Sequence, residues 1–163
     1  MTTTGSFYEK QFCRVCESSN IKEALRLTPT PPGNNFLPEE NLSFDEEVFP
    51  LELFFCEDCN HIQLGHVVEP EFLFQNNYSY VSSTSRVFVK HLEDYANSIT
   101  ERINLKDESL VIDIGSNDGT CLSFFKQKKM QVLGVDPAEE VSKIANDNGI
   151  NTLNDFFDKD TAK

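Results

Sequence analysis

The fold of this chain is decided by one stretch, Val111-Ile112-Asp113-Ile114-Gly115-Ser116-Asn117-Asp118-Gly119-Thr120. The apolar run 110–114 is typical of a buried parallel strand, and the glycines that follow predict a tight turn. Residues 120–129 then fit a helix, residues 131–135 a second strand and residues 138–148 a second helix, with glycine at the C-cap position 149. Strand, helix, strand and helix in this order predict an α/β fold with a parallel sheet.

The turn after the first strand is a candidate binding site for a nucleotide-type ligand. Gly115 and Gly119 let the backbone approach a ligand closely, because no side chain stands in the way. Asp136 ends the second strand, where a carboxylate can accept hydrogen bonds from both hydroxyls of a ribose. The NAD fingerprint requires glycine at 115, 117 and 120, but Asn117 and Thr120 depart from it, which disfavours a dinucleotide. A turn that binds no ligand stays an alternative.

Four cysteines form two identical pairs, Cys13-x-x-Cys16 and Cys56-x-x-Cys59. Zn²⁺ prefers four sulfur or nitrogen ligands in a tetrahedron, and two such turns brought together supply four thiolates. A closed site of this kind has no open coordination position, so the pattern predicts a structural zinc rather than a catalytic one. Disulfides and a redox pair are weaker alternatives, because Cys121 has no partner and neither pair opens a helix after a strand.

The residues around the second pair predict a small zinc-ribbon hairpin. Residues 48–55 fit a strand that runs into the pair, and residues 62–68 fit a strand that leaves it. His61 could compete as a ligand, although a place in the departing strand is the more ordinary interpretation. The prolines and glycine at 29–33 predict an extended, non-helical path between the two pairs.

A helix joins the two halves. It is indicated by apolar side chains that recur every three or four residues, at Phe88, Leu92, Tyr95, Ile99 and Ile103. The serines before it, at 82, 83 and 85, are typical helix caps. We therefore expect a zinc-binding domain over residues 1–68, a connector and helix over residues 69–106, and the beginning of an α/β sheet domain over residues 107–163.

The composition excludes several classes of partner. The 163 residues carry 27 acidic and 14 basic side chains, a net charge of -13, and no basic run. Nucleic-acid binding requires clustered lysine and arginine, so we expect no nucleic-acid partner. No apolar stretch approaches the length that spans a bilayer, and the N-terminus does not resemble a targeting sequence. These features predict no membrane association and a reducing, cytoplasmic location.

The motifs, taken in order, resemble one known family. They are the two cysteine pairs, the run Asn60-His61-Ile62-Gln63-Leu64, the segment Tyr78-x-Tyr80-x-Ser82-Ser83-x-Ser85, the run Asp113–Thr120 and Gly134-Val135-Asp136-Pro137-Ala138. This order is similar to that of the zinc-containing, S-adenosylmethionine-dependent C-methyltransferases of deoxysugar biosynthesis, which act on nucleotide-linked 4-keto sugars. The resemblance extends from about residue 13 to residue 157. It is much more specific as an ordered set than in any one motif.

The resemblance implies a fold, two cofactors and a set of site residues. The α/β half would be the first part of a Rossmann-like class I methyltransferase sheet that binds S-adenosylmethionine, and Zn²⁺ would be structural. Cofactor contacts are implied at Asp113, Gly115, Ser116, Asn117, Asp118, Gly119, Asp136 and Pro137. Zinc ligands are implied at Cys13, Cys16, Cys56 and Cys59. Tyr78 and Tyr80 are the catalytic candidates, since their phenols could hydrogen-bond a sugar oxygen; a role as packed aromatics stays the alternative.

Members of that family are much longer than this chain. They have a complete sheet and a further C-terminal domain, so we expect a truncated protein that is inactive alone, with its general base downstream of Lys163. Two other functions stay open: a zinc-ribbon interaction module without catalysis, and a methyltransferase for another small molecule. The sequence does not identify the sugar, the methylated atom or the oligomeric state.

Overall fold

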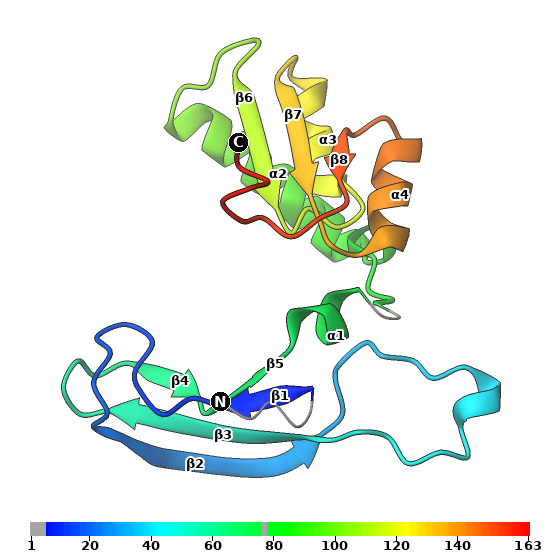
Figure 1. Ribbon diagram of the computed structural model, residues 1–163. Helices are drawn as coiled ribbons and strands as arrows, with labels where there is room; N and C mark the ends of the chain where they lie inside the picture. Colours follow the sequence, from blue (N-terminus) through cyan, green and yellow to red (C-terminus); the bar gives the residue numbers. More distant parts are fainter. Residues whose placement is uncertain (1–5, 76–77) are drawn as a thin grey trace. The chain divides into compact units, whose positions relative to one another are not determined.

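The computed structural model describes residues 6–75 and 78–163, and it divides the chain into two compact units, Met1–Asn77 and Tyr78–Lys163 (Figure 1). The segment 69–106, set apart from the sequence as a connector, is divided between them. Helix α1 (Pro70–Phe74) lies in the first unit, and helix α2 (Arg86–Arg102) lies in the second. The domain boundaries drawn from the sequence remain a prediction.

The first unit is built from two small antiparallel sheets. Its strands are β1 (Phe7–Glu9), β2 (Ile21–Thr30), β3 (Phe49–Cys56), β4 (Ile62–Leu64) and β5 (His66–Val68). One sheet pairs β1 with β5, and the other has the order β2-β3-β4. The predicted hairpin around the second cysteine pair is confirmed, because β3 and β4 are antiparallel neighbours with Leu53 opposite Leu64.

The predicted strand 62–68 is interrupted at Gly65. β4 ends before this glycine and β5 begins after it, and the two strands belong to different sheets. A Cβ atom at residue 65 would lie 2.3 Å from a ring carbon of Phe54. Glycine is therefore required here by close packing, and the chain changes sheets at the same point.

Strand β2 was not predicted from the sequence. Nine of its ten residues are exposed, and its apolar and polar side chains alternate only over residues 25–28, which is too short a run to mark a half-buried strand. Its register against β3 also shifts between Glu23 and Leu25 and again between Leu27 and Thr30. β2 ends at Thr30, immediately before Pro31, which has no N–H to donate.

The first unit has a slight core. Three aromatic contacts, all edge to face, join Phe7 to Phe49 at 5.6 Å, Phe7 to His66 at 5.6 Å and Phe49 to Phe72 at 5.3 Å between ring centroids. In the described part of this unit, the buried hydrophobic side chains are Phe49 and two cysteines, Cys13 and Cys56. The segment 31–48, which contains the short helix η1 (Glu39–Asn41), exposes Phe36, Leu42 and Phe44 to solvent.

The second unit contains the predicted α/β alternation. Its elements are η2 (Ser82–Thr84), α2, β6 (Leu110–Ile114), α3 (Thr120–Gln127), β7 (Gln131–Val135), α4 (Glu139–Asp147) and β8 (Thr152–Leu153). The three strands are parallel and lie in the order β6-β7-β8 (Figure 1). Each predicted strand and helix of residues 110–148 is present, with ends that differ by two residues at most.

The helices pack against one face of this sheet. Val111 and Val132 contact two buried clusters, one formed by Ala96, Phe125 and Met130, the other by Leu122, Ala145 and Ile150. The alternate side chains of β6, at Leu110, Ile112 and Ile114, are about half exposed. The carboxyl ends of β6 and β7 carry the glycine turn and Asp136, so the turn lies at the edge where an α/β sheet binds ligands.

Helix α2 buries only part of the face expected from the sequence. Ala96 is fully buried and Ile99 packs beside it, whereas Phe88, Tyr95 and Ile103 are substantially exposed. Among the described residues, no helix is both long and apolar enough to cross a bilayer.

Candidate metal centre and cofactor turn

The two cysteine pairs form turns with the same hydrogen bonds. In each turn the N–H of the first cysteine donates to the carbonyl five residues on, and its carbonyl accepts from the N–H four residues on. The N···O distances are 2.8 and 3.0 Å for Cys13, and 2.8 and 2.9 Å for Cys56. The residue four positions on is left-handed in both, with φ of 60° at Glu17 and 62° at Asn60. The repeated spacing in the sequence therefore corresponds to a repeated backbone geometry.

The four sulfur atoms are close enough to share one metal ion. All of them lie within 4.8 Å of one another; Cys13 Sγ is 3.5 Å from Cys59 Sγ, and Cys16 Sγ is 3.6 Å from Cys56 Sγ. A tetrahedral zinc with bonds of ~2.3 Å separates its sulfurs by about 3.8 Å. A disulfide requires about 2.05 Å, so the cysteines are not paired as disulfides. The donor set and its size fit Zn²⁺.

His61 does not join this cluster. Among the described residues, the group of potential ligands consists of the four cysteines alone. The backbone carbonyl of His61 instead accepts the hydrogen bond from the N–H of Cys56, at 2.8 Å. His61 therefore acts through its main chain, by closing the second turn.

Without a bound metal ion, the thiols of the cluster do not ionise equally. The backbone N–H of Cys16 lowers the pKa of Cys13 to about 6, although burial opposes it. At Cys59 the backbone N–H of His61 favours the thiolate, but the neighbouring thiols and burial raise the pKa to about 12. Four thiolates at neutral pH therefore require a cation at their centre, as zinc binding provides.

A buried glutamine joins the two cysteine turns. The Oε1 atom of Gln63, in β4, accepts from the backbone N–H of Arg14 at 2.8 Å, and its Nε2 donates to the carbonyl of Phe12 at 3.1 Å. Gln63 is only 5% exposed. Both polar ends of one side chain thus satisfy the backbone on either side of Cys13, which positions the first turn against the strand that leaves the second.

Asp58, inside the second pair, makes a further connection. Its carboxylate accepts hydrogen bonds from the hydroxyl of Ser18 and from Nδ2 of Asn20, the latter at 3.0 Å. The Ser18 bond, followed by the Asn20 bond, lowers the pKa of Asp58. The backbone N–H of Glu57 also donates to the Asn20 carbonyl at 3.0 Å. The two turns are therefore joined by protein contacts as well as by their common thiol cluster.

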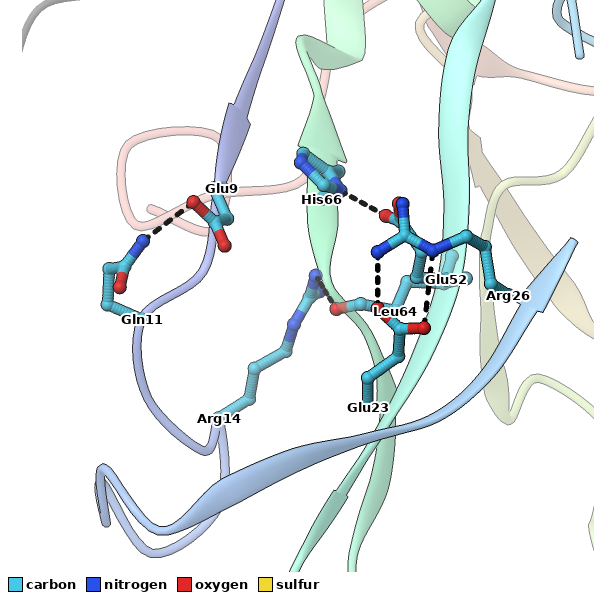
Figure 2. Close-up of polar contacts among 8 residues, drawn as sticks. All are labelled: Glu9, Gln11, Arg14, Glu23, Arg26, Glu52, Leu64 and His66. Atoms are coloured by element: carbon cyan, nitrogen blue, oxygen red, sulfur yellow. Dashed lines mark hydrogen bonds and ion pairs between the residues drawn. The ribbon is translucent and has the colours of Figure 1, made fainter. Parts of the chain in front are cut away.

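A buried carboxylate ties β3 to the strands beside it (Figure 2). Glu52 is 7% exposed; its Oε1 lies 2.9 Å from Arg26 Nη1, and its Oε2 lies 2.9 Å from His66 Nδ1. Arg26 also pairs with Glu23 on its own strand. A buried charge is tolerated only when it is paired, and the guanidinium of Arg26 supplies the paired charge beside Glu52. This group is structural.

The two glycines of the turn differ in what surrounds them. Gly115 has φ of 78°, and a Cβ atom there would meet nothing within 4 Å. Gly119 has φ of 75°, but its Cβ would lie 2.9 Å from the side chain of Ile150. The sequence predicted that both glycines leave room for a ligand, but open space is present only beside Gly115. Gly119 is required because α3 packs closely on the chain that follows α4.

Asp136 lies beside the turn, as its place at the end of β7 implied. The side chain is 6% exposed; one carboxylate oxygen accepts the N–H of Asn117 at 2.8 Å, and the other accepts the N–H of Ala138 at 2.9 Å. Each carboxylate oxygen can accept a second hydrogen bond. Pro137 lies between Asp136 and the N-cap of α4. The role of these two residues in cofactor binding remains a prediction.

The other predicted cofactor residues are brought together at the same edge. Burial, and then the charge of Asp136, raise the pKa of Asp113. Asp118 accepts from the backbone N–H of Thr120 at 3.1 Å and from its hydroxyl at 2.7 Å, so it caps α3. Ser116 is buried beneath the turn, where its hydroxyl oxygen would lie 2.5 Å from a Cβ at residue 134. Asp118 and Ser116 thus shape the turn rather than face the open space.

Tyr78 and Tyr80 lie in the segment before α2. Burial, and then the charge of Asp136, raise the pKa of Tyr78, so its phenol is within electrostatic reach of the turn. Tyr80 is partly exposed, and its backbone carbonyl accepts from Nδ2 of Asn117 at 2.9 Å. This contact could not be predicted from the sequence, because a hydrogen bond between residues 37 apart leaves no local pattern. A catalytic role for either phenol remains a prediction.

Comparison with known proteins agrees with the thiol geometry. Residues 13–74 match the sequence profile of a family described as "Putative zinc binding domain". This segment is similar to that zinc-binding family. Its limits enclose all four cysteines, β2 to β5 and helix α1. The zinc-binding domain predicted from the cysteine spacing is therefore confirmed, and the family match extends six residues past the boundary at 68.

A longer similarity covers both units. The chain is 37% identical over 141 residues to the C-methyltransferase NovU of Streptomyces niveus, which is 86% of this chain and 33% of that protein. The chain thus spans about a third of the length of this relative and corresponds to an N-terminal portion of it. The resemblance to zinc-containing C-methyltransferases is confirmed at the level of sequence.

The bridging glutamine of the zinc-binding domain gives a first testable prediction. We expect Gln63→Ala to destabilise the zinc-loaded domain by about 1–3 kcal/mol, because two buried backbone groups lose their partner. The zinc affinity, measured by competition with a chromogenic chelator, should fall about tenfold to a hundredfold. Gln11→Ala is the control, since Gln11 is exposed and its side chain bonds only Glu9. An unchanged affinity in Gln63→Ala would show that the metal alone positions the turns.

Asp113 gives a second prediction, on pH. Because the pKa of Asp113 is raised by burial and then by Asp136, the folded protein favours its protonated form. Stability should therefore decline as pH rises from the ordinary carboxyl pKa of about 4 through the raised value. We expect Asp113→Asn to raise the urea midpoint of the second unit at pH 7 and to leave it unchanged near pH 3. Asp107→Asn is the control, because Asp107 is exposed. An equal rise of the urea midpoint in both variants, or a larger rise at pH 3 than at pH 7, would contradict a raised pKa of Asp113.

Proposed function

We propose that this chain is the N-terminal part of an S-adenosylmethionine-dependent C-methyltransferase that acts on a nucleotide-linked 4-keto sugar or a similar small molecule. The 37% identity to a C-methyltransferase over 141 residues carries the proposal. An aligned length of 141 out of 163 residues must include the glycine turn. The parallel order β6-β7-β8 also supports a Rossmann-like sheet, since successive strands added on one side form half of a doubly wound fold.

The charge around the turn favours a cationic ligand. Asp113, Asp118 and Asp136 lie at or beside the turn, and no lysine or arginine stands between residues 110 and 125. Three carboxylates repel the pyrophosphate of a dinucleotide, whereas they attract a sulfonium and an amino group. S-Adenosylmethionine, when bound, supplies a methyl group on a positively charged sulfur. The cofactor we infer is therefore S-adenosylmethionine, not NAD.

Each residue of the turn has a proposed task. The open space beside Gly115 admits the ligand next to the backbone, and Asp136 accepts from the ribose hydroxyls with its remaining lone pairs. Tyr78 and Tyr80 hydrogen-bond an oxygen of the sugar substrate and hold its reacting carbon near the methyl donor. The zinc ion has a structural task, since four thiolates leave no coordination position for a substrate.

Ligand binding by the 163-residue chain tests the proposal. We expect calorimetry or saturation-transfer NMR to detect S-adenosylmethionine and S-adenosylhomocysteine, and to detect no NAD binding. Asp136→Asn should weaken adenosylhomocysteine binding, while the exposed Asp107→Asn should not. Binding of NAD without binding of either adenosyl ligand would reverse the assignment of the cofactor.

A second candidate is a zinc-ribbon interaction module without catalysis. It is favoured by the exposed apolar side chains of the segment 31–48, at Phe36, Leu42 and Phe44, which a partner protein could cover. A methyltransferase for another small molecule would share all the features of the turn. Adenosylhomocysteine binding distinguishes the proposed function from an interaction module. Methyl transfer to a nucleotide 4-keto sugar distinguishes it from a methyltransferase for another small molecule. The acidic composition supports a small-molecule substrate over nucleic acid.

A further inference from the structure

The glycine turn holds a second segment of the chain by three hydrogen bonds. We call residues 78–85 the tyrosine segment. The amide of Asn117 donates to the Tyr80 carbonyl at 2.9 Å, and its Oδ1 accepts from the Ser82 N–H at 2.8 Å. The Oδ2 atom of Asp118 accepts from the Ser83 N–H at 3.0 Å. Three polar groups of the backbone between residues 80 and 83 are thus bound by two adjacent side chains of the turn.

Asn117 is suited to this task by its backbone as well as its side chain. Its φ of 51° is left-handed, a conformation that asparagine tolerates better than most residues. In this conformation its own N–H donates to Asp136 at 2.8 Å while its side chain reaches the tyrosine segment. The residue is 8% exposed, so its hydrogen bonds are sheltered from water. One residue therefore contacts both the carboxylate proposed for the ribose and the segment that carries the phenols.

The phenol of Tyr78 lies near the same edge of the sheet, within electrostatic reach of Asp136. Tyr78 interacts electrostatically with Asp136 and with Tyr80. The segment then continues through η2 into α2, whose first turn is capped by the hydroxyl of Ser85 at 3.3 Å from the Phe88 nitrogen. The position of the segment is therefore fixed at its far end by a helix and at its near end by the turn.

We propose that Asn117, assisted by Asp118, is a positioning residue that couples ligand binding at the glycine turn to the placement of Tyr78 and Tyr80. This inference rests on the proposed function for the identity of the ligand. A ligand that contacts Asp136 and the backbone beside Gly115 orders the loop that contains Asn117, and Asn117 in turn orders the tyrosine segment. Because such coupling is reciprocal, a substitution that loosens the tyrosine segment also lowers the affinity for the ligand.

The first test measures the attachment without any ligand. Hydrogen exchange of the Ser82 and Ser83 amides is followed by NMR in the 163-residue chain and in Asn117→Gly, in which glycine keeps the left-handed backbone. We expect exchange at Ser82 to accelerate at least tenfold, with a smaller change at Ser83, which Asp118 still holds. Asn104→Gly is the matched control, because Asn104 is also left-handed, with φ of 54°, and is exposed. Unchanged exchange at Ser82 in Asn117→Gly overturns the proposal.

A second variant guards against a general loss of structure. Asn117→Asp keeps the oxygen that accepts from Ser82 and loses the group that donates to Tyr80. We expect the Ser82 amide to stay protected from exchange in this variant. Exchange at Ser82 as fast as in the glycine variant overturns the assigned contact.

The final test adds S-adenosylhomocysteine. In the original chain we expect bound ligand to slow exchange at Ser82 further, and in Asn117→Gly we expect the affinity to fall about fivefold to thirtyfold, with Asn104→Gly unchanged. If the original chain binds no adenosylhomocysteine, the proposed function fails while the attachment measured without ligand still stands. If it binds but neither Ser82 exchange nor the affinity in Asn117→Gly changes, the coupling is overturned and the proposed function stands.

Discussion

Replacement of Cys56 by serine will unfold the first unit and leave the second unit folded. Cys56 is completely buried, and its sulfur lies 3.6 Å from that of Cys16 within the thiol cluster. Structural zinc contributes on the order of 10–16 kcal/mol to the folding of small domains, far more than the slight aromatic core around Phe49 can replace. The second unit has its own buried clusters around Leu122 and Phe125, so it should not depend on the metal.

Metal analysis and two-dimensional amide NMR check this result. We expect one zinc per chain in the original protein and loss of zinc in Cys56→Ser, together with collapse of the signals from residues 6–75 and persistence of those from residues 78–163. Cys121→Ser is the control: burial, and then Asp113, raise the pKa of Cys121 to about 11, so its thiol stays protonated and lies outside the cluster. Full zinc content in Cys56→Ser, or a folded first unit without metal, would contradict a structural zinc.

Substitution of Gly119 by alanine has the second largest expected effect. Three glycines share almost the same left-handed backbone, with φ of 78° at Gly115, 75° at Gly119 and 78° at Gly149. Alanine in this conformation costs about 1–2 kcal/mol at any of them. At Gly119 the new methyl group also meets Ile150 at 2.9 Å, and such overpacking adds about 1–3 kcal/mol. We therefore expect about 2–5 kcal/mol of destabilisation in the second unit, measured by urea unfolding.

The corresponding alanine variants of Gly149 and Gly115 separate the free-energy cost of the backbone conformation from that of the steric clash. At Gly149 the nearest atom to a new Cβ is the mobile Nζ of Lys126 at 3.6 Å, so Gly149→Ala should lose only the backbone cost. Gly115→Ala should lose the same amount of stability. It should also weaken the binding of adenosylhomocysteine, because the new methyl group enters the open space beside the turn. Equal destabilisation of Gly119→Ala and Gly149→Ala would show that α3 moves away from Ile150 at little cost.

Local signals in the sequence were sufficient for much of this architecture. The two cysteine pairs predict their turns because each turn is a few residues long and is closed by two hydrogen bonds within it. The strands and helices of residues 110–148 were readable because apolar runs and a C-cap glycine mark their ends. The edge position of Asp136 followed from the parallel topology, since all strands of such a sheet end on the same side.

The features that were missed depend on partners distant in the sequence. β2 is an exposed strand whose register shifts twice, and its apolar and polar residues alternate only over residues 25–28. Gly65 interrupts a strand because the ring of Phe54 occupies its side-chain position, and Gly119 is needed because of Ile150. The inward side of α2 depends on Ala96, a residue too small to dominate a hydrophobic pattern. Contacts of this kind become visible only when the elements are placed together.

The position of the thiol cluster at one end of β2 and β3 determines where residues can be inserted or deleted in this protein. Ile21 pairs with Cys56 at one end of the two strands, next to the metal ligands, and Thr30 pairs with Phe49 at the other end. The segment 31–48 therefore joins the strands at the end remote from the thiols. The entropy of closing such a loop rises only by about 0.6 kcal/mol for each doubling of its length. Residues can accordingly be inserted or deleted at this tip without moving a sulfur atom, which makes it the natural point of divergence among proteins built on the same zinc-binding hairpin.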